Sequence, residues 1–112
     1  MSLRVHKIVH FFSYEISLFY VIIFIEVDKM DYVAIDFETA NSNLTSTCGM
    51  GIVCIKNNQI YEEWHSLINP QEEFAEFNIF IHKITPEDVE NEKTIIELWP
   101  TIYNYLNNQI VV

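Results

Sequence analysis

The residues best suited to chemistry in this sequence are two carboxylates, Asp36 and Glu38, at the end of an apolar run. The run over 32–37 is typical of a strand buried on both faces, where an unpaired carboxylate is costly. Residues two apart on a strand share a face, so the two Cα atoms would lie about 6–7 Å apart. Like charges this close repel each other unless they are protonated or bridged by cations. The pair therefore favours Mg²⁺ or Mn²⁺, which can bind a substrate phosphate and support phosphodiester hydrolysis.

A structural interpretation of the same pair stays open, in which Asp36 caps the strand and Glu38 faces solvent. The position of the pair argues against it, because the pair ends the first fully apolar strand and precedes a long hairpin. The other acidic pairs, Glu62–Glu63 and Glu72–Glu73, are interpreted as solvated faces.

Composition limits the classes of function that the chain can have. Its 112 residues suffice for one domain with a modest core. The net charge of −10 excludes nucleic-acid binding by a general basic surface, so any such role needs a local site that recruits a metal cation. Cys48 and Cys54 lack the spacing of a zinc site or a disulfide framework, and they favour a reducing, cytoplasmic location.

Hydrophobic patterning predicts the elements that must position the carboxylates. Strands are expected over 32–37, 47–56, 59–68 and 109–112. A short helical turn is expected over 77–82, a helix start at Thr85-Pro86, and a longer helix from Thr94 to Asn107. Pro100 lies inside the longer helix and should kink it or shift its start. This order of elements predicts an α/β domain with a mixed sheet.

Residues 1–29 form an apolar N-terminal extension that allows three interpretations. It could be a signal anchor, a strand or helix added to the core, or a segment that is not native to the domain. Its uninterrupted apolar part, 16–25, is shorter than the roughly 20 residues that span a bilayer, so no stable membrane association is expected. Met30 directly precedes the first clear strand and favours the third interpretation, with the domain over 30–112.

Three stretches carry a resemblance when they are taken together: Asp36-Phe37-Glu38-Thr39, Leu67-Ile68-Asn69-Pro70 and Ile81-His82-Lys83-Ile84-Thr85. In this combination the sequence resembles the DEDD 3′–5′ exonucleases, of the type found in the epsilon subunit of bacterial DNA polymerase III. The resemblance implies a ribonuclease-H-like fold with a mixed sheet. It also implies stepwise, two-metal removal of nucleotides from the 3′ end of DNA, in preference to RNA, with Mg²⁺ or Mn²⁺ as cofactor.

The resemblance also implies roles for individual residues. By it, Asp36 and Glu38 match the first two metal-binding carboxylates and are the catalytic residues. The backbone of Glu38, Thr39 and Ala40 would hold the terminal nucleotide, and His82 and Ile84 would lie near its base or sugar. The partners implied are a nucleic-acid 3′ end and a polymerase or helicase.

The sequence departs from the family pattern at several points. Lys83 stands where the family usually has Gly, and neither the H-N-x-x-F-D stretch nor the late H-x-x-x-x-D is found. We therefore expect 30–112 to be the N-terminal part of an exonuclease domain, truncated after the fourth predicted strand and inactive as this chain. Two alternatives stay open: a non-catalytic interaction module derived from an exonuclease, and a small membrane-anchored protein.

Overall fold

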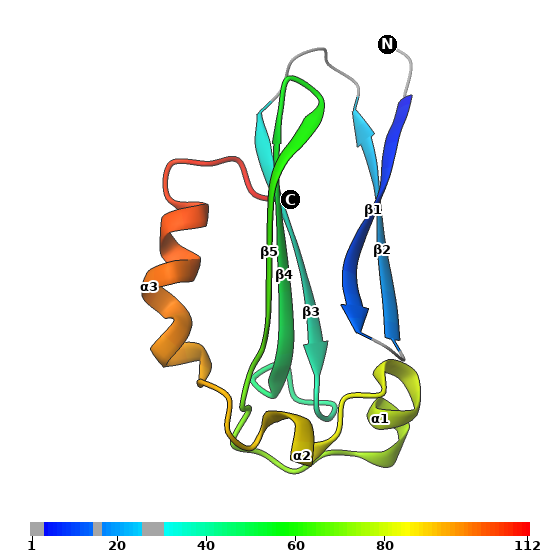
Figure 1. The fold of residues 1–112 in the computed structure, drawn as a ribbon, viewed down its shortest axis with the longest axis vertical. Helices are drawn as coiled ribbons and strands as arrows, with labels where there is room; N and C mark the ends of the chain where they lie inside the picture. The colour runs from blue at the N-terminus through cyan, green and yellow to red at the C-terminus, as the bar shows by residue number, and fades with distance from the viewer. Residues whose placement is uncertain (1–3, 15–16, 26–30) are drawn as a thin grey trace.

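The computed structural model describes residues 4–14, 17–25 and 31–112, with side chains described over 31–112. Its larger sheet has three antiparallel strands in the order β3-β4-β5 (Figure 1). These strands are β3 (Tyr32–Thr39), β4 (Thr47–Lys56) and β5 (Gln59–Leu67). Asn57 and Asn58 connect β4 to β5 with φ angles of 51° and 63°, as a two-residue hairpin turn with positive φ at both positions requires. The predicted hairpin is confirmed.

The last residues of the chain run parallel to β3 on the edge opposite β4. The Val33 N–H donates to the Ile110 carbonyl at 2.8 Å, and the Val112 N–H donates to the Val33 carbonyl at 2.9 Å. Val33 and Val111 form a parallel bridge. The strand expected over 109–112 is present only as an isolated parallel bridge, which places the end of the chain beside β3.

Three helices follow β5: α1 (Glu76–His82), α2 (Pro86–Val89) and α3 (Ile95–Leu106). The predicted helix starts are confirmed, because the Asp88 carboxylate accepts from the Thr85 N–H at 2.9 Å and Thr94 forms a capping box with Glu97. Pro100 lies inside α3 and does not delay its start, which directly follows Thr94.

Helix α3 covers one face of the sheet, and Figure 1 shows it beside β4 and β5. Apolar side chains of the strands and the helix interlock there, as the alternation of β4 and the helical spacing of α3 require. The buried cluster consists of Val33, Met50, Ile52, Cys54, Ile68 and Ile102.

A separate antiparallel hairpin, β1 (Arg4–Tyr14) and β2 (Ser17–Ile25), lies on the side of the sheet away from α3 (Figure 1). Strand β1 contacts β4 and β5, and β2 contacts α1. Met30, the expected start of the domain, lies outside the described residues. Within the described part of the chain, none of the helices has the length and apolar character needed to cross a membrane.

Candidate active site

Asp36 and Glu38 lie on the face of β3 that is turned away from α3. Val33 and Ile35 alternate with them and pack in the cluster under the helix, so the two carboxylates share the opposite face, as predicted. Asp36 is half-buried, and its Oδ1 accepts a hydrogen bond from the Phe37 N–H at 3.0 Å. Glu38 is only 6% exposed. The interpretation that Glu38 faces solvent is therefore wrong, since the strand carries it into the interior.

Both carboxyl groups are held in surroundings that oppose their ionisation. Burial, with the charge of Asp36 as a second cause, raises the pKa of Glu38 to about 8. Burial also raises the pKa of Asp36, although its hydrogen bond to the Phe37 backbone acts in the other direction. The Oε1 atom of Glu38 is buried and has no hydrogen-bond partner among the described residues. A cation beside these groups would supply the missing interaction and favour the ionised forms.

Two glycines of β4 lie beside the carboxylates, so these two positions on that face of the sheet have no side chain. Asp36 pairs with Gly51, and Glu38 pairs with Gly49. Glycine weakens the interior of a strand and often marks a place where a ligand approaches the backbone closely. The two glycines of β4 have the same spacing as the two carboxylates of β3. This correspondence can be recognised only when the register of the two strands is known.

His82 joins the end of β3 to the end of α1. Its Nε2 donates to the Thr39 carbonyl at 2.9 Å, and its Nδ1 accepts from the Ile84 N–H at 3.0 Å. The ring is 2% exposed, and burial lowers its pKa. These contacts describe a neutral imidazole with its proton on Nε2. Because both nitrogens are engaged, His82 fixes the position of the Thr39 backbone.

The other residues predicted to bind the nucleotide also gather at this end of β3. Ala40 and Ile84 are fully buried together in a small cluster with Cys48 and Val89. The Ala40 N–H donates to the Ser46 carbonyl, and its own carbonyl accepts from the Ala75 N–H, both at 2.8 Å. Thr39 is partly exposed. Nucleotide contacts by these residues stay a prediction, and the packing assigns Ala40 and Ile84 to the support beneath Thr39.

Sequence reasoning missed one contributor to this support, Asn78 of α1. Its side-chain amide donates to the Thr39 carbonyl at 3.0 Å and lies 3.3 Å from the Asn41 carbonyl. No signal in the sequence distinguishes it from other polar residues of a short helix.

Lys83, where the resemblance implies Gly, has a backbone conformation that favours glycine. Lys83 follows the last turn of α1 in the left-handed conformation, with φ 66° and ψ 5°. Its N–H donates to the Ile79 carbonyl at 2.7 Å. Gly adopts this conformation without a steric cost, whereas Lys adopts it only with one. The Lys83 ammonium lies 4.5 Å from the centre of the Phe80 ring, a cation–π contact that offsets part of this cost.

The carboxylate pair stands without a third ligand in the described part of the chain. Over 31–112, no group of three or more His, Cys, Asp or Glu side chains is arranged to hold a metal ion. Asp88 is committed to the start of α2. Carboxylate oxygens are the ligands that Mg²⁺ and Mn²⁺ prefer. The buried Oε1 of Glu38 lacks a hydrogen-bond partner among the described residues, and the paired glycines leave space beside it. The pair therefore fits a weakly held Mg²⁺ or Mn²⁺.

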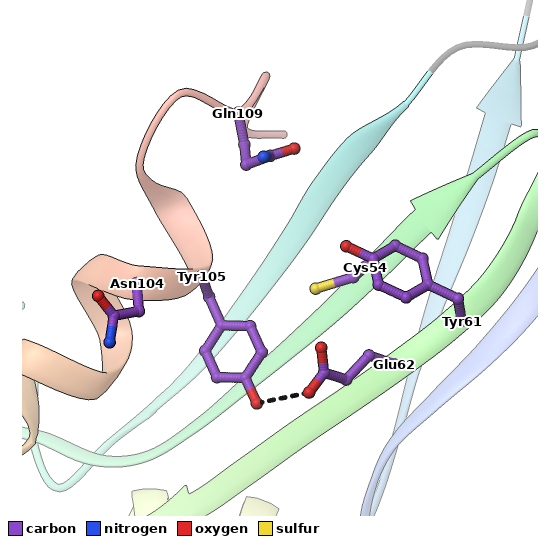
Figure 2. A pocket seen from close by; sticks show the side chains of 6 residues that line it. All are labelled: Cys54, Tyr61, Glu62, Asn104, Tyr105 and Gln109. Carbon is purple, nitrogen blue, oxygen red and sulfur yellow. Dashed lines mark hydrogen bonds between the residues drawn. The ribbon is translucent and has the colours of Figure 1, made fainter.

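A hollow lies between α3 and the ends of β4 and β5 that are joined by the Asn57–Asn58 turn, on the face of the sheet opposite the carboxylates (Figure 2). Its volume is about 260 Å³. The Tyr105 hydroxyl donates to Glu62 Oε1 at 3.1 Å across it. Cys54, Tyr61, Asn104 and Gln109 complete its lining. It contains none of the predicted site residues.

Comparison with known proteins matches this arrangement to one family. The family model described as Exonuclease (RNase_T) matches residues 33–112. The chain is 33% identical over 87 residues to the DNA polymerase III PolC-type of Thermotoga petrophila, and 34% identical over 83 residues to that of Thermotoga maritima. These stretches cover 76% and 72% of the chain but 6% of each relative, so the chain spans a small fraction of the length of these curated relatives.

Proposed function

Because the chain belongs to the exonuclease family, we propose that residues 30–112 form the N-terminal part of a 3′–5′ exonuclease domain with Asp36 and Glu38 as its metal-binding carboxylates. Residues 1–29 would be an extension outside this domain. A ribonuclease-H-like fold for the domain is supported by the three-stranded antiparallel sheet and by the parallel contact of 110–112 with β3.

The observation that carries this proposal is the buried Oε1 of Glu38, which lies beside a second carboxylate and has no hydrogen-bond partner in the part of the chain whose side chains are described. Asp36 and Glu38 would hold Mg²⁺ or Mn²⁺ on the face of β3 that is turned away from α3. Such cations, when bound, neutralise the charge of a phosphodiester and promote attack by water. The residues of the chain would orient the cation and the terminal nucleotide, with His82 and Asn78 fixing the Thr39 backbone at the edge of the site.

The substrate proposed is the 3′ end of DNA, in preference to RNA. The names of the two relatives, both DNA polymerases, support this choice. A polymerase or helicase partner and a cytoplasmic location are part of the same proposal. Three exposed apolar side chains of α3, Ile96, Trp99 and Tyr103, support a protein contact on that helix. With two carboxylates and no third metal-ligating side chain grouped with them among the described residues, we propose metal and nucleotide binding without turnover for the 112-residue polypeptide.

The proposal is tested by urea unfolding with Mn²⁺ or with chelator. A ligand that binds only the folded protein raises the free energy of unfolding by mass action. We expect millimolar Mn²⁺ to stabilise the parent and the control Glu92→Gln, an exposed carboxylate in a turn, but not Asp36→Asn. A parent that does not respond to Mn²⁺ would refute the metal site.

A further inference from the structure

An irregularity in β5 turns two neighbouring side chains toward the hollow beside the end of α3. Glu62 pairs with Cys54, which packs on the α3 side of the sheet, but the register then shifts and Ile55 pairs with Ile60. Tyr61 is the extra residue of this shift, as in a β-bulge. Consecutive residues of a regular strand project to opposite faces, yet Tyr61 and Glu62 both line the hollow. The bulge therefore adds an aromatic side chain to the wall that carries Glu62.

Tyr105 of α3 forms the opposite wall and is held in place by two contacts. Its ring centroid lies 5.9 Å from that of Trp64, and its hydroxyl donates to Glu62 Oε1 at 3.1 Å (Figure 2). This bond uses one of the roughly four acceptor positions of a carboxylate. Because Glu62 is exposed, its other acceptor positions can be reached by a ligand that enters the hollow.

The lining of the hollow has a negative charge and no positive charge to balance it. Of the six described residues that line it, Glu62 is the one acid and none is a base. Burial raises the pKa of Cys54, so this thiol stays neutral at pH 7. Asn104 and Gln109 have amide oxygens that accept hydrogen bonds. The chain has a net charge of −10, which also attracts cations toward its surface.

A guanidinium group is the cation that this lining fits best. It is planar, has five donors in a fixed fork and stacks on aromatic rings, so it can bond to a carboxylate and an amide oxygen while it lies against a tyrosine. An ammonium group is a compact point charge with three donors and makes less use of aromatic walls. The volume of about 260 Å³ is below the range of roughly 300–1,000 Å³ that is typical of sites for whole small molecules, so the hollow suits one side chain.

We propose that this hollow binds an arginine side chain of another polypeptide, with Glu62 as the carboxylate that pairs with the guanidinium. The one arginine of the chain itself, Arg4, begins β1 on the side of the sheet away from α3 (Figure 1). The hollow lies on the face opposite Asp36 and Glu38, so this inference does not depend on the metal site.

The experiment is a ¹H–¹⁵N NMR titration of the full chain with N-acetyl-L-arginine amide, a blocked arginine that resembles a residue within a polypeptide. We expect saturable shifts of the side-chain amide signals of Asn104 and Gln109 at millimolar ligand. N-acetyl-L-citrulline amide has nearly the same shape without the charge and should bind at least about tenfold more weakly. Free L-arginine should bind no more tightly than the blocked form, because the hollow has no cationic side chain for its α-carboxylate among the described lining residues.

Glu62→Gln keeps an acceptor for Tyr105 but removes the charge, so the affinity for the blocked arginine should fall about tenfold. Tyr61→Leu keeps apolar bulk but removes the aromatic face, and it should lower the affinity about threefold. This second variant tests the site on its own if Glu62→Gln does not fold. Glu63→Gln is the matched control, since it makes the same change of charge at an exposed residue that pairs with Val53 and does not line the hollow. It should leave the affinity unchanged.

Three results would overturn the proposal. Shifts that do not saturate, or an equal response to the citrulline compound, would show that the hollow does not recognise a guanidinium. An equal loss of affinity in Glu62→Gln and Glu63→Gln would assign the response to the net charge of the chain. Tighter binding of free L-arginine than of the blocked form would identify the ligand as the free amino acid, and a polypeptide source would then be wrong.

Discussion

Glu38 of β3 and Gly49 of β4 lie directly opposite each other, so a buried carboxyl group faces a position without a side chain. An unpartnered buried carboxyl lowers stability, and a strand-interior glycine lowers it further. Neither choice benefits the packing of the sheet. Together they leave room for a cation and its ligand, which agrees with the tendency of binding sites to reduce the stability of the unliganded protein.

Glu38→Gln should stabilise the metal-free protein at pH 8 by about 1–2 kcal/mol. The pKa of Glu38 is raised from 4.5 to about 8, so between these values the folded protein keeps a proton that the unfolded chain has released. The free energy of unfolding of the parent should therefore fall as the pH rises from 5 to 8, and this dependence should weaken in Glu38→Gln. Urea unfolding with chelator at both pH values measures the effect. A variant that is less stable than the parent at pH 8 would show that the carboxylate has a structural role.

His82→Ala should cost about 2–3 kcal/mol, because it empties a buried site and removes two hydrogen bonds that join β3 to α1. Asn78→Ala removes the second donor to the Thr39 carbonyl and should cost about 1 kcal/mol.

Burial lowers the pKa of His82, so below about pH 6.5 the unfolded chain binds a proton that the folded protein resists. The parent should lose this contribution as the pH falls from 6.5, and His82→Ala should not. Urea unfolding of the three proteins at pH 7 and pH 5.5 tests this. A His82→Ala variant with the same free energy of unfolding as the parent would contradict the structural role of His82.

Lys83→Gly should stabilise the protein by about 0.5 kcal/mol. Replacing Lys by Gly removes the steric cost of the left-handed conformation at φ 66°, which stabilises the protein by about 1 kcal/mol. It also removes the cation–π contact with Phe80, which destabilises the protein by about 0.5 kcal/mol. Lys93→Gly is the matched control, since Lys93 is not among the residues with positive φ, and its added chain entropy should destabilise the protein. Thermal unfolding of the two variants decides the point, and the same loss in both would show that Lys83 is unstrained.

The sequence was sufficient for features that depend on local pattern. The shared face of Asp36 and Glu38, the Asn57–Asn58 turn and the start of α3 at Thr94 follow from residue spacing and capping chemistry. Features that depend on strand register could not be predicted. Gly49 and Gly51 look like weak strand residues until β3 is placed beside β4.

Burial was the second limit on prediction. A lone histidine is equally compatible with a surface, a core or a ligand, and only the packing of α1 against β3 shows that His82 is structural. The N-terminal segment also had several possible structures. Its alternation was not regular enough to distinguish a strand pair from an apolar helix or an anchor.

A chain that begins at Met30 should keep the fold of β3 to α3 and respond to Mn²⁺ at least as strongly as the full chain. The described residues of the cluster under α3, among them Val33, Ile52 and Ile102, come from β3, β4 and α3 and the segment after β5. The family match also begins after the hairpin, at residue 33. Because β1 contacts β4 and β5 on the side away from α3, its removal should open the face that carries Asp36 and Glu38.

The deletion also has a cost, which sets the expected size of the effect. Ala34, Val53 and Ile55 are at most 4% exposed on that face in the full chain, and each buried apolar side chain of this kind contributes about 1–3 kcal/mol. We therefore expect lower stability with chelator but a larger gain on addition of Mn²⁺, with the near-ultraviolet circular dichroism of Trp64 and Trp99 retained. Urea unfolding of both chains, with chelator and with Mn²⁺, gives the comparison. Loss of cooperative unfolding in the shorter chain would show that β1–β2 belongs to the core, and residues 1–29 would then be part of the domain.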